Sequence, residues 1–179
     1  MGRGRARKTV GGKVRPTTQK ILGSLSSILR PRLEGAKVLD MFAGSGRVGL
    51  RILEEGAEHV IFVEAHRKVA QDLREIIRES PFKEHCSLVI GPVPKTLFKI
   101  KGTYDLLLCD PPYDWKEPKT LLPSSRHLCE IGGLLVVEHH HKTPYEATEG
   151  WLLQRQEKFG ETRLSFFERV SKTEGHEPS

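Results

Sequence analysis

Cysteines are few in this 179-residue sequence, and long apolar segments are absent from it. The three cysteines, Cys86, Cys109 and Cys129, form no CxxC pair and show no zinc-site spacing, so we expect reduced thiols, no metal site and a cytoplasmic protein. No apolar run reaches the roughly 18 residues of a membrane-spanning helix, and the first residues lack the apolar core of a secretory signal. These absences predict a globular protein without a disulfide framework or a membrane partner.

Acidic residues are nearly absent from positions 1–37, where ten Lys and Arg accompany a single acid, Glu34. The remaining residues, with 19 basic and 22 acidic side chains, are slightly negative, so the net charge of +6 originates in this segment. A basic arm suits a polyanionic partner, whereas a solvated charged tail is the alternative. The residues that we assign to RNA binding are Arg3, Arg5, Arg7, Lys8, Lys13, Arg15, Thr17 and Thr18.

Strand and helix patterns alternate along the middle of the chain, which predicts an α/β domain. A helix that begins with a capping Thr is expected over about 18–30. Strands are expected over 36–43, 59–63, 87–90, 104–109 and 134–138, and helices over about 66–79, 94–100 and 117–130. A closing hairpin is expected over 151–157 and 163–170. We therefore predict a mostly parallel sheet with helices on both faces and antiparallel strands at one side. The expected divisions are a basic arm and helix (1–35), one domain (36–170) and a disordered polar tail (171–179).

A glycine-rich loop follows the first expected strand. Gly44, Gly46 and Gly49 match the GxGxxG spacing of nucleotide-binding loops, and Glu64 lies 20 positions after Gly44 at the end of the second strand. Because NAD, FAD and S-adenosylmethionine all present a ribose to such a site, the loop alone does not determine which of the three cofactors binds. Asp40 favours S-adenosylmethionine, since a carboxylate near the loop can bind its α-amino group and would repel pyrophosphate. The predicted cofactor-binding residues are Asp40, Phe42, Ala43, Gly44, Ser45, Gly46, Glu64, Ala65, Gly91, Pro92, Val93 and Asp110.

The tetrapeptide Asp110-Pro111-Pro112-Tyr113 follows the fourth apolar run. Two prolines lack the N–H donors of a strand, so the backbone leaves the sheet here in a fixed, extended shape. A carboxylate and backbone carbonyls before an aromatic ring can accept hydrogen bonds from an amine while the ring stacks on a flat substrate. We predict that Asp110, Pro111, Pro112 and Tyr113 form the catalytic segment; a proline-rich turn without further function is the alternative.

The motif set Asp40-x-Phe42-x-Gly44-x-Gly46, Glu64 and Asp110-Pro111-Pro112-Tyr113 resembles class I S-adenosylmethionine-dependent amino-methyltransferases. More narrowly, residues 10–170 resemble the RsmD-like family of small-subunit (16S) ribosomal RNA guanine-N2 methyltransferases. Four further stretches carry this likeness: Arg15-Pro16-Thr17-Thr18, Val136-Val137-Glu138-His139, Phe159-Gly160-Glu161-Thr162 and Leu164-Ser165-Phe166-Phe167. The resemblance implies a Rossmann-like fold with a seven-stranded sheet and a C-terminal antiparallel hairpin, and a ribosomal guanine as methyl acceptor. The chain departs from the family pattern at Gln19 and Gly91, where the family commonly has an acid, and at Ser26-Ser27, where the family has a bulkier Phe-Asn pair.

These features together predict an enzyme that transfers a methyl group from S-adenosylmethionine to the exocyclic N2 amine of a guanine in small-subunit ribosomal RNA. The alternatives are an adenine-N6 methyltransferase acting on DNA or RNA, an NAD-dependent oxidoreductase, and a non-catalytic RNA-binding protein on a degenerate methyltransferase fold. The expected partner is ribosomal RNA or the small ribosomal subunit, and we expect a monomer.

Two further groups of residues lie near the predicted catalytic segment. His139, His140 and His141 are consecutive on a strand and alternate between its faces, so they do not suit one metal ion. We expect His139 near the catalytic segment and the other two in solvent. Trp115 and Lys116 either contact RNA or pack within the loop.

Overall fold

The computed structural model describes residues 16–112 and 115–171, with the side chains of 16–18 outside that description. Its α-helices are α1 (Pro16–Leu29), α2 (Arg47–Glu54), α3 (Arg67–Glu79) and α4 (Pro118–Ser125). Short 3-10 helices are η1 (Arg30–Arg32), η2 (Lys83–His85), η3 (Lys95–Lys99) and η4 (Arg126–Leu128). The strands are β1 (Lys37–Asp40), β2 (His59–Glu64), β3 (Cys86–Ile90), β4 (Tyr104–Cys109), β5 (Cys129–His140), β6 (Trp151–Phe159) and β7 (Thr162–Arg169).

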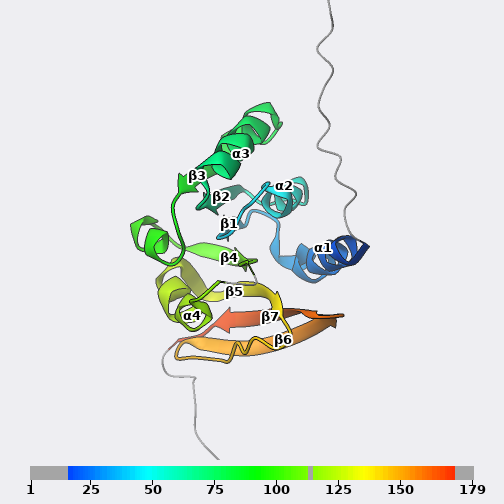
Figure 1. Cartoon of the computed structure of the whole chain (residues 1–179), viewed down its shortest axis with the longest axis vertical. Helices are drawn as coiled ribbons and strands as arrows, with labels where there is room; N and C mark the ends of the chain where they lie inside the picture. The colour runs from blue at the N-terminus through cyan, green and yellow to red at the C-terminus, as the bar shows by residue number, and fades with distance from the viewer. Residues whose placement is uncertain (1–15, 113–114, 172–179) are drawn as a thin grey trace, which may run out of the picture.

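The strands form one seven-stranded sheet in the order β3-β2-β1-β4-β5-β7-β6 (Figure 1). The five strands from β3 to β5 in this order are parallel, whereas β7 runs antiparallel to both of its neighbours. Parallel strands require crossover connections, and the helices between them supply these. The predicted α/β fold, with its mostly parallel sheet and antiparallel C-terminal hairpin, is therefore confirmed.

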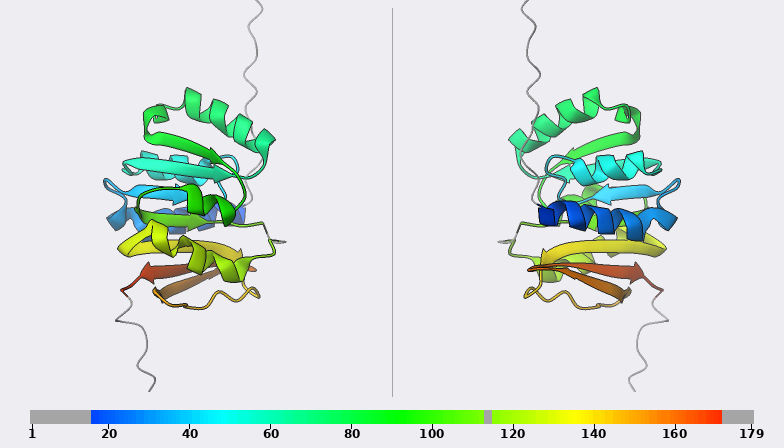
Figure 2. Two further views of the ribbon diagram at one scale, coloured as in Figure 1. Left: turned by 90° about the vertical axis from the view of Figure 1, so that its left-hand side faces the viewer. Right: turned by 90° about the vertical axis from the view of Figure 1, so that its right-hand side faces the viewer.

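Helices cover both faces of the sheet (Figure 2). On one face, α1, α2 and α3 bury apolar side chains against alternate residues of the strands, including Leu25 of α1, Ile52 of α2 and Leu73 of α3. On the other face, η3 and α4 pack against the intervening residues through Leu97 and Leu121. The helix that follows the basic arm thus shares one core with the sheet. None of the helices in the described ranges is both long and apolar enough to span a membrane.

Several predicted boundaries are wrong; the first strand, for example, ends at Asp40 and not at position 43. The first helix begins at Pro16, two residues before the predicted start, because proline is favoured in the first helical turn, where its missing N–H has no partner to lose. The strand β5 begins at Cys129 and includes Gly132-Gly133, whereas we predict a helix to about 130 and a strand only from 134. A side chain at Gly133 would lie 2.9 Å from the carbonyl oxygen of Asp105, so this glycine allows a close approach within the sheet.

Candidate active site

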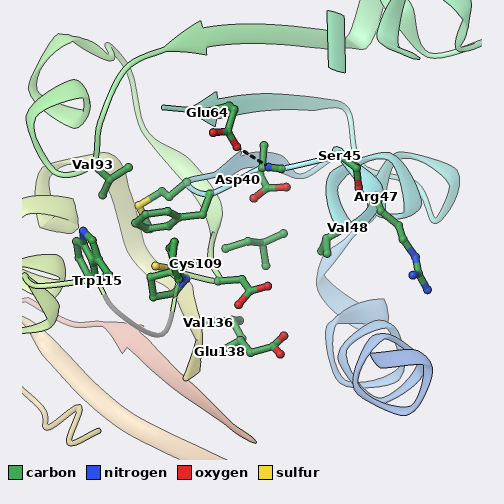
Figure 3. Close-up of a pocket in the computed structure, with 18 of the residues that line it drawn as sticks. Asp40, Ser45, Arg47, Val48, Glu64, Val93, Cys109, Trp115, Val136 and Glu138 are labelled. Atoms are coloured by element: carbon green, nitrogen blue, oxygen red, sulfur yellow. Dashed lines mark hydrogen bonds between the residues drawn. The ribbon is translucent and has the colours of Figure 1, made fainter. Parts of the chain in front are cut away.

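A cavity of about 750 Å³ lies at the carboxyl ends of the parallel strands, the edge where open α/β sheets bind ligands (Figure 3). Except for Gly46, every residue predicted to bind a cofactor lines it, as do Pro111 and Pro112. Gly46 is buried, and a side chain there would lie 2.4 Å from Leu73, so this glycine contacts α3. Tyr113 lies outside the described residues.

Four carboxylates line this cavity: Asp40, Glu64, Asp110 and Glu138. The register of the sheet fixes their relative positions. Asp40 belongs to a row of paired residues that crosses four strands, Phe62, Asp40, Leu108 and Val136. The other three acids each lie two residues beyond a member of that row, so they stand level with one another on the same face of the sheet. Asp110 and Glu138 are on neighbouring segments, and Glu64 is separated from them by β1. The cavity therefore has a strongly acidic floor.

Burial raises the pKa values of three of these acids, Asp40, Asp110 and Glu138. Burial raises the pKa of Asp40 to about 7, and the charge of Asp110 adds to the shift, although the backbone N–H groups of Phe42 and Gly49 oppose it. Burial also raises the pKa of Glu138 to about 7, again with a contribution from Asp110. Asp110 faces the solvent in the cavity, yet the enclosing protein raises its pKa to about 6. A cationic ligand would stabilise the ionised forms of all three.

Positive charge in the cavity comes from the opposite side. Among the described residues that line it, Arg47 is the one Lys or Arg. Its side chain is exposed and extends away from Asp40 and Glu64 (Figure 3). The acidic floor is therefore left unneutralised, which suits a cation and opposes a phosphate.

Glu64 ties the glycine loop to the end of β2. One carboxylate oxygen, Oε2, accepts the Gly44 N–H at 2.9 Å, and the other, Oε1, accepts the His66 N–H at 2.7 Å. Gly44 has a φ of 53°, a backbone conformation that glycine adopts without steric cost. Since the Gly44 N–H donates to a carboxylate, it is not directed at a phosphate as in pyrophosphate-binding loops. This geometry disfavours the NAD interpretation.

The segment after β4 packs against the end of β1. Trp115 donates its backbone N–H to the carbonyl of Pro112 at 2.9 Å, and its ring meets Phe42 edge-on with centroids 5.3 Å apart. Trp115 also lines the cavity, at the same end as Val93 (Figure 3). These contacts with Pro112 and Phe42 favour loop packing over RNA contact as the role of Trp115.

The end of β3 has no acid, as predicted, and the structure gives a reason for its glycine. A side chain at Gly91 would lie 2.3 Å from the Oγ1 atom of buried Thr96. Thr96 in turn donates its backbone N–H to the Pro92 carbonyl at 2.8 Å. Gly91 and Thr96 thus form a matched pair that brings the backbone close to the cavity.

His139 is buried on the other side of the catalytic segment. Its ring nitrogen Nε2 lies 2.8 Å from the Ser165 hydroxyl, and its ring packs against Tyr145 at 4.7 Å. Together with Pro111 and Pro112 it lines a second cavity of about 50 Å³. His139 is near the catalytic segment, as expected, but it lines this small cavity and not the large one. In the described part of the chain, no cluster of three or more His, Cys, Asp or Glu suits a metal ion.

Two parts of the cavity were missed by the sequence analysis. The first is Glu138, which follows the apolar run 134–137 just as Asp110 follows the run 104–109; this parallel was the available signal. The second is an apolar wall made by α1 and β7, whose pattern indicated only a core-facing surface: Ile21, Leu22, Leu25 and Leu164. Of the predicted RNA-binding residues, Arg3 to Arg15 and the side chains of Thr17 and Thr18 lie outside the described residues.

Comparisons with known proteins identify the family of this chain. The family model described as "Conserved hypothetical protein 95" matches residues 2–168. "Putative rRNA methyltransferase YlbH" of Bacillus subtilis is 30% identical over 174 residues, covering 93% of this chain and 95% of the relative. Ribosomal RNA small subunit methyltransferase D of Escherichia coli is 28% identical over 169 residues, covering 90% and 82%.

A solved structure supports the fold independently. The structure titled "Putative methyltransferase yhhF from Escherichia coli" has a TM-score of 0.77 at 24% identity and covers 88% of each chain. The family resemblance predicted from the motifs is thereby confirmed, and the chain belongs to the family described as conserved hypothetical protein 95, the RsmD-like family.

Proposed function

We propose that this protein transfers a methyl group from S-adenosylmethionine to the N2 amine of a guanine in small-subunit ribosomal RNA. The observation that carries the proposal is the acidic floor beside the glycine loop, because the cofactor is a cation at both its sulfonium and its α-amino group. A cavity of about 750 Å³ also has the size of a typical cofactor site. The names of the relatives from B. subtilis and E. coli support ribosomal RNA as the substrate.

Each part of the cavity fits one part of the cofactor. Asp40 would accept hydrogen bonds from the α-amino group. Glu64 would hold the ribose hydroxyls with the lone pairs that its two backbone hydrogen bonds leave available. The end of the cavity near Val93 and Trp115 would hold the adenine, which stacks well on apolar and aromatic side chains.

The catalytic segment would position the acceptor. S-adenosylmethionine supplies an electrophilic methyl carbon, so a C–N bond forms as the C–S bond breaks, and the amine then loses a proton. An exocyclic amine is a poor nucleophile because its lone pair is conjugated with the ring. Asp110 and the Pro111 carbonyl would accept its two N–H groups and turn the lone pair toward the methyl carbon. Tyr113 would stack on the base, which must be turned out of its surroundings.

The test is mass spectrometry of small-subunit ribosomal RNA nucleosides from cells with and without this protein. We expect N2-methylguanosine to fall by one residue per subunit in its absence and to return when the gene is restored. A loss of N6-methyladenosine instead would establish the adenine alternative. No change in any methylated nucleoside would favour the non-catalytic alternative and overturn the proposal.

A further inference from the structure

Glu138 is a half-buried acid in the cavity that the methyl-transfer mechanism leaves unused. It lies beside Asp110 at the ends of adjacent parallel strands, since Cys109 and Val137 are paired in register. Neighbouring strands are about 4.8 Å apart, so both side chains reach one small substrate group. The side chain of Glu138 forms no hydrogen bond or ion pair within residues 16–112 and 115–171, although its backbone is paired with Leu164 of β7. A half-buried carboxylate of this kind is available to a ligand.

In the described part of the chain, apolar side chains of β7 and α1 line the cavity beside Glu138. Leu164 of β7 is its register partner, and both residues line the cavity. Leu22 and Leu25 of α1 form the apolar wall of the same cavity. The carboxylate of Glu138 projects into this space (Figure 3). A flat base that entered between the apolar wall and Asp110 would therefore present its edge to Glu138.

Guanine and adenine differ at that edge. Guanine carries two adjacent donors, the N1–H and the N2 amine, whereas adenine carries one donor amine beside an N1 acceptor. If Asp110 and the Pro111 carbonyl accept both hydrogens of the guanine amine, the neighbouring N1–H remains to be satisfied. An ionised carboxylate accepts a hydrogen bond from an N–H and repels a lone pair. Glu138, the neighbour of Asp110 on β5, would therefore distinguish the two bases.

We propose that Glu138 is the specificity-determining residue for guanine, accepting the N1–H of the base while Asp110 and Pro111 hold the amine. This inference rests on the proposed function, because it names how that acceptor is recognised. Adenine in the same pose would place its N1 lone pair against the carboxylate, so Glu138 both selects guanine and rejects adenine.

The test separates the N1–H from the amine. 2-Aminopurine keeps the 2-amine of guanine but has a lone pair at N1. We would first map the modified position by mass spectrometry of oligonucleotide fragments from the same ribosomal RNA. Guanine or 2-aminopurine would then be placed at that position in an otherwise identical fragment of small-subunit ribosomal RNA. The methylation rates of the two RNAs are then compared for the wild type, for Glu138→Gln and for Glu130→Gln. Glu130 is a matched control because it lies at the opposite end of the same strand and is exposed.

The wild type should prefer guanine by at least roughly tenfold, the usual scale for discrimination by one well-placed polar contact. Glu138→Gln should reduce this preference to near unity, because an amide can turn its NH₂ group toward the N1 lone pair. Glu130→Gln should keep the wild-type ratio. An unchanged ratio in Glu138→Gln would overturn the inference while leaving the proposed function intact. Absence of methylation by the wild type on the guanine RNA would instead count against the proposed function.

Discussion

At the scale of single residues, Asp110 carries the most specific prediction. Replacing it with Ala should lower the rate of methyl transfer by roughly a hundredfold or more, because the acceptor amine loses its orientation. Binding of the cofactor, measured by isothermal titration calorimetry, should weaken much less than turnover, since Asp40 and Glu64 remain. Asp105→Ala is the control: it lies at the other end of β4, where its carboxylate accepts the Lys37 backbone N–H. Retained turnover in Asp110→Ala would contradict the assignment.

The raised pKa of Asp40 predicts how cofactor binding depends on pH. With a pKa of about 7, this carboxylate is largely protonated and neutral at pH 5.5 and ionised at pH 8. A cation binds the ionised form, so the affinity for S-adenosylmethionine should rise with pH through about 6–7, by up to tenfold per pH unit for each proton released. Asp40→Asn should bind more weakly and flatten this profile. Titrations at several pH values test both points, and affinity in the wild type that is independent of pH would exclude Asp40 as the group responsible.

The residues of the cavity were predictable where a strand end and a motif coincided. Glu64 and Asp110 each close an apolar run, and Asp40 precedes the glycine loop by four residues. Parallel strands gather such ends at one edge of the sheet. Glu138 also closes an apolar run, but the sequence alone did not show that Asp110 would be its neighbour. That relation depends on the register of β4 and β5, which is a long-range property of the sheet.

At the scale of elements, two glycines should respond oppositely to the same change. Gly49→Ala in α2 places a methyl group 2.3 Å from the buried ring of Phe62, and overpacking of this kind costs about 1–3 kcal/mol. Gly23→Ala in α1 meets nothing within 4 Å and replaces glycine in a helix interior, which should stabilise the fold by up to about 1 kcal/mol. Denaturant unfolding of the two variants measures both effects. Equal stabilities would contradict the packing of α2 against β2.

Element types followed from periodicity, whereas some boundaries depended on tertiary contacts. The apolar runs of β1, β2 and β4 and the amphipathic pattern of α3 are local signals, and the predictions from them hold. The pair Gly132-Gly133 is also a local signal, but it is compatible with two structures: the end of a helix, or a strand in close contact with a neighbouring strand. The approach of Gly133 to Asp105 selects the strand, and no local pattern contains that contact.

At the scale of the whole molecule, positive and negative charge are separated along the chain. Residues 1–37 hold ten of the 29 basic side chains, and the remainder is slightly negative, with an acidic cavity at the carboxyl ends of its parallel strands. An acidic cavity attracts the cofactor but repels RNA phosphates over a Debye length of about 8–10 Å. A base can therefore reach Asp110 only if attraction elsewhere offsets this repulsion. The basic arm, joined directly to α1 and hence to the apolar wall of the cavity, is the segment with the charge to supply it.

Deleting residues 1–14 tests this division of roles. The deletion removes five Lys and Arg residues and keeps all of α1. Each lost phosphate contact should reduce the slope of log affinity against log salt by about 0.7–0.9, so RNA binding should weaken most at low salt and its salt dependence should fall. Cofactor affinity should stay unchanged, because every described residue of the cavity remains. If the deletion variant binds RNA with the affinity and salt slope of the full chain, the arm does not supply the attraction that offsets the repulsion of RNA phosphates.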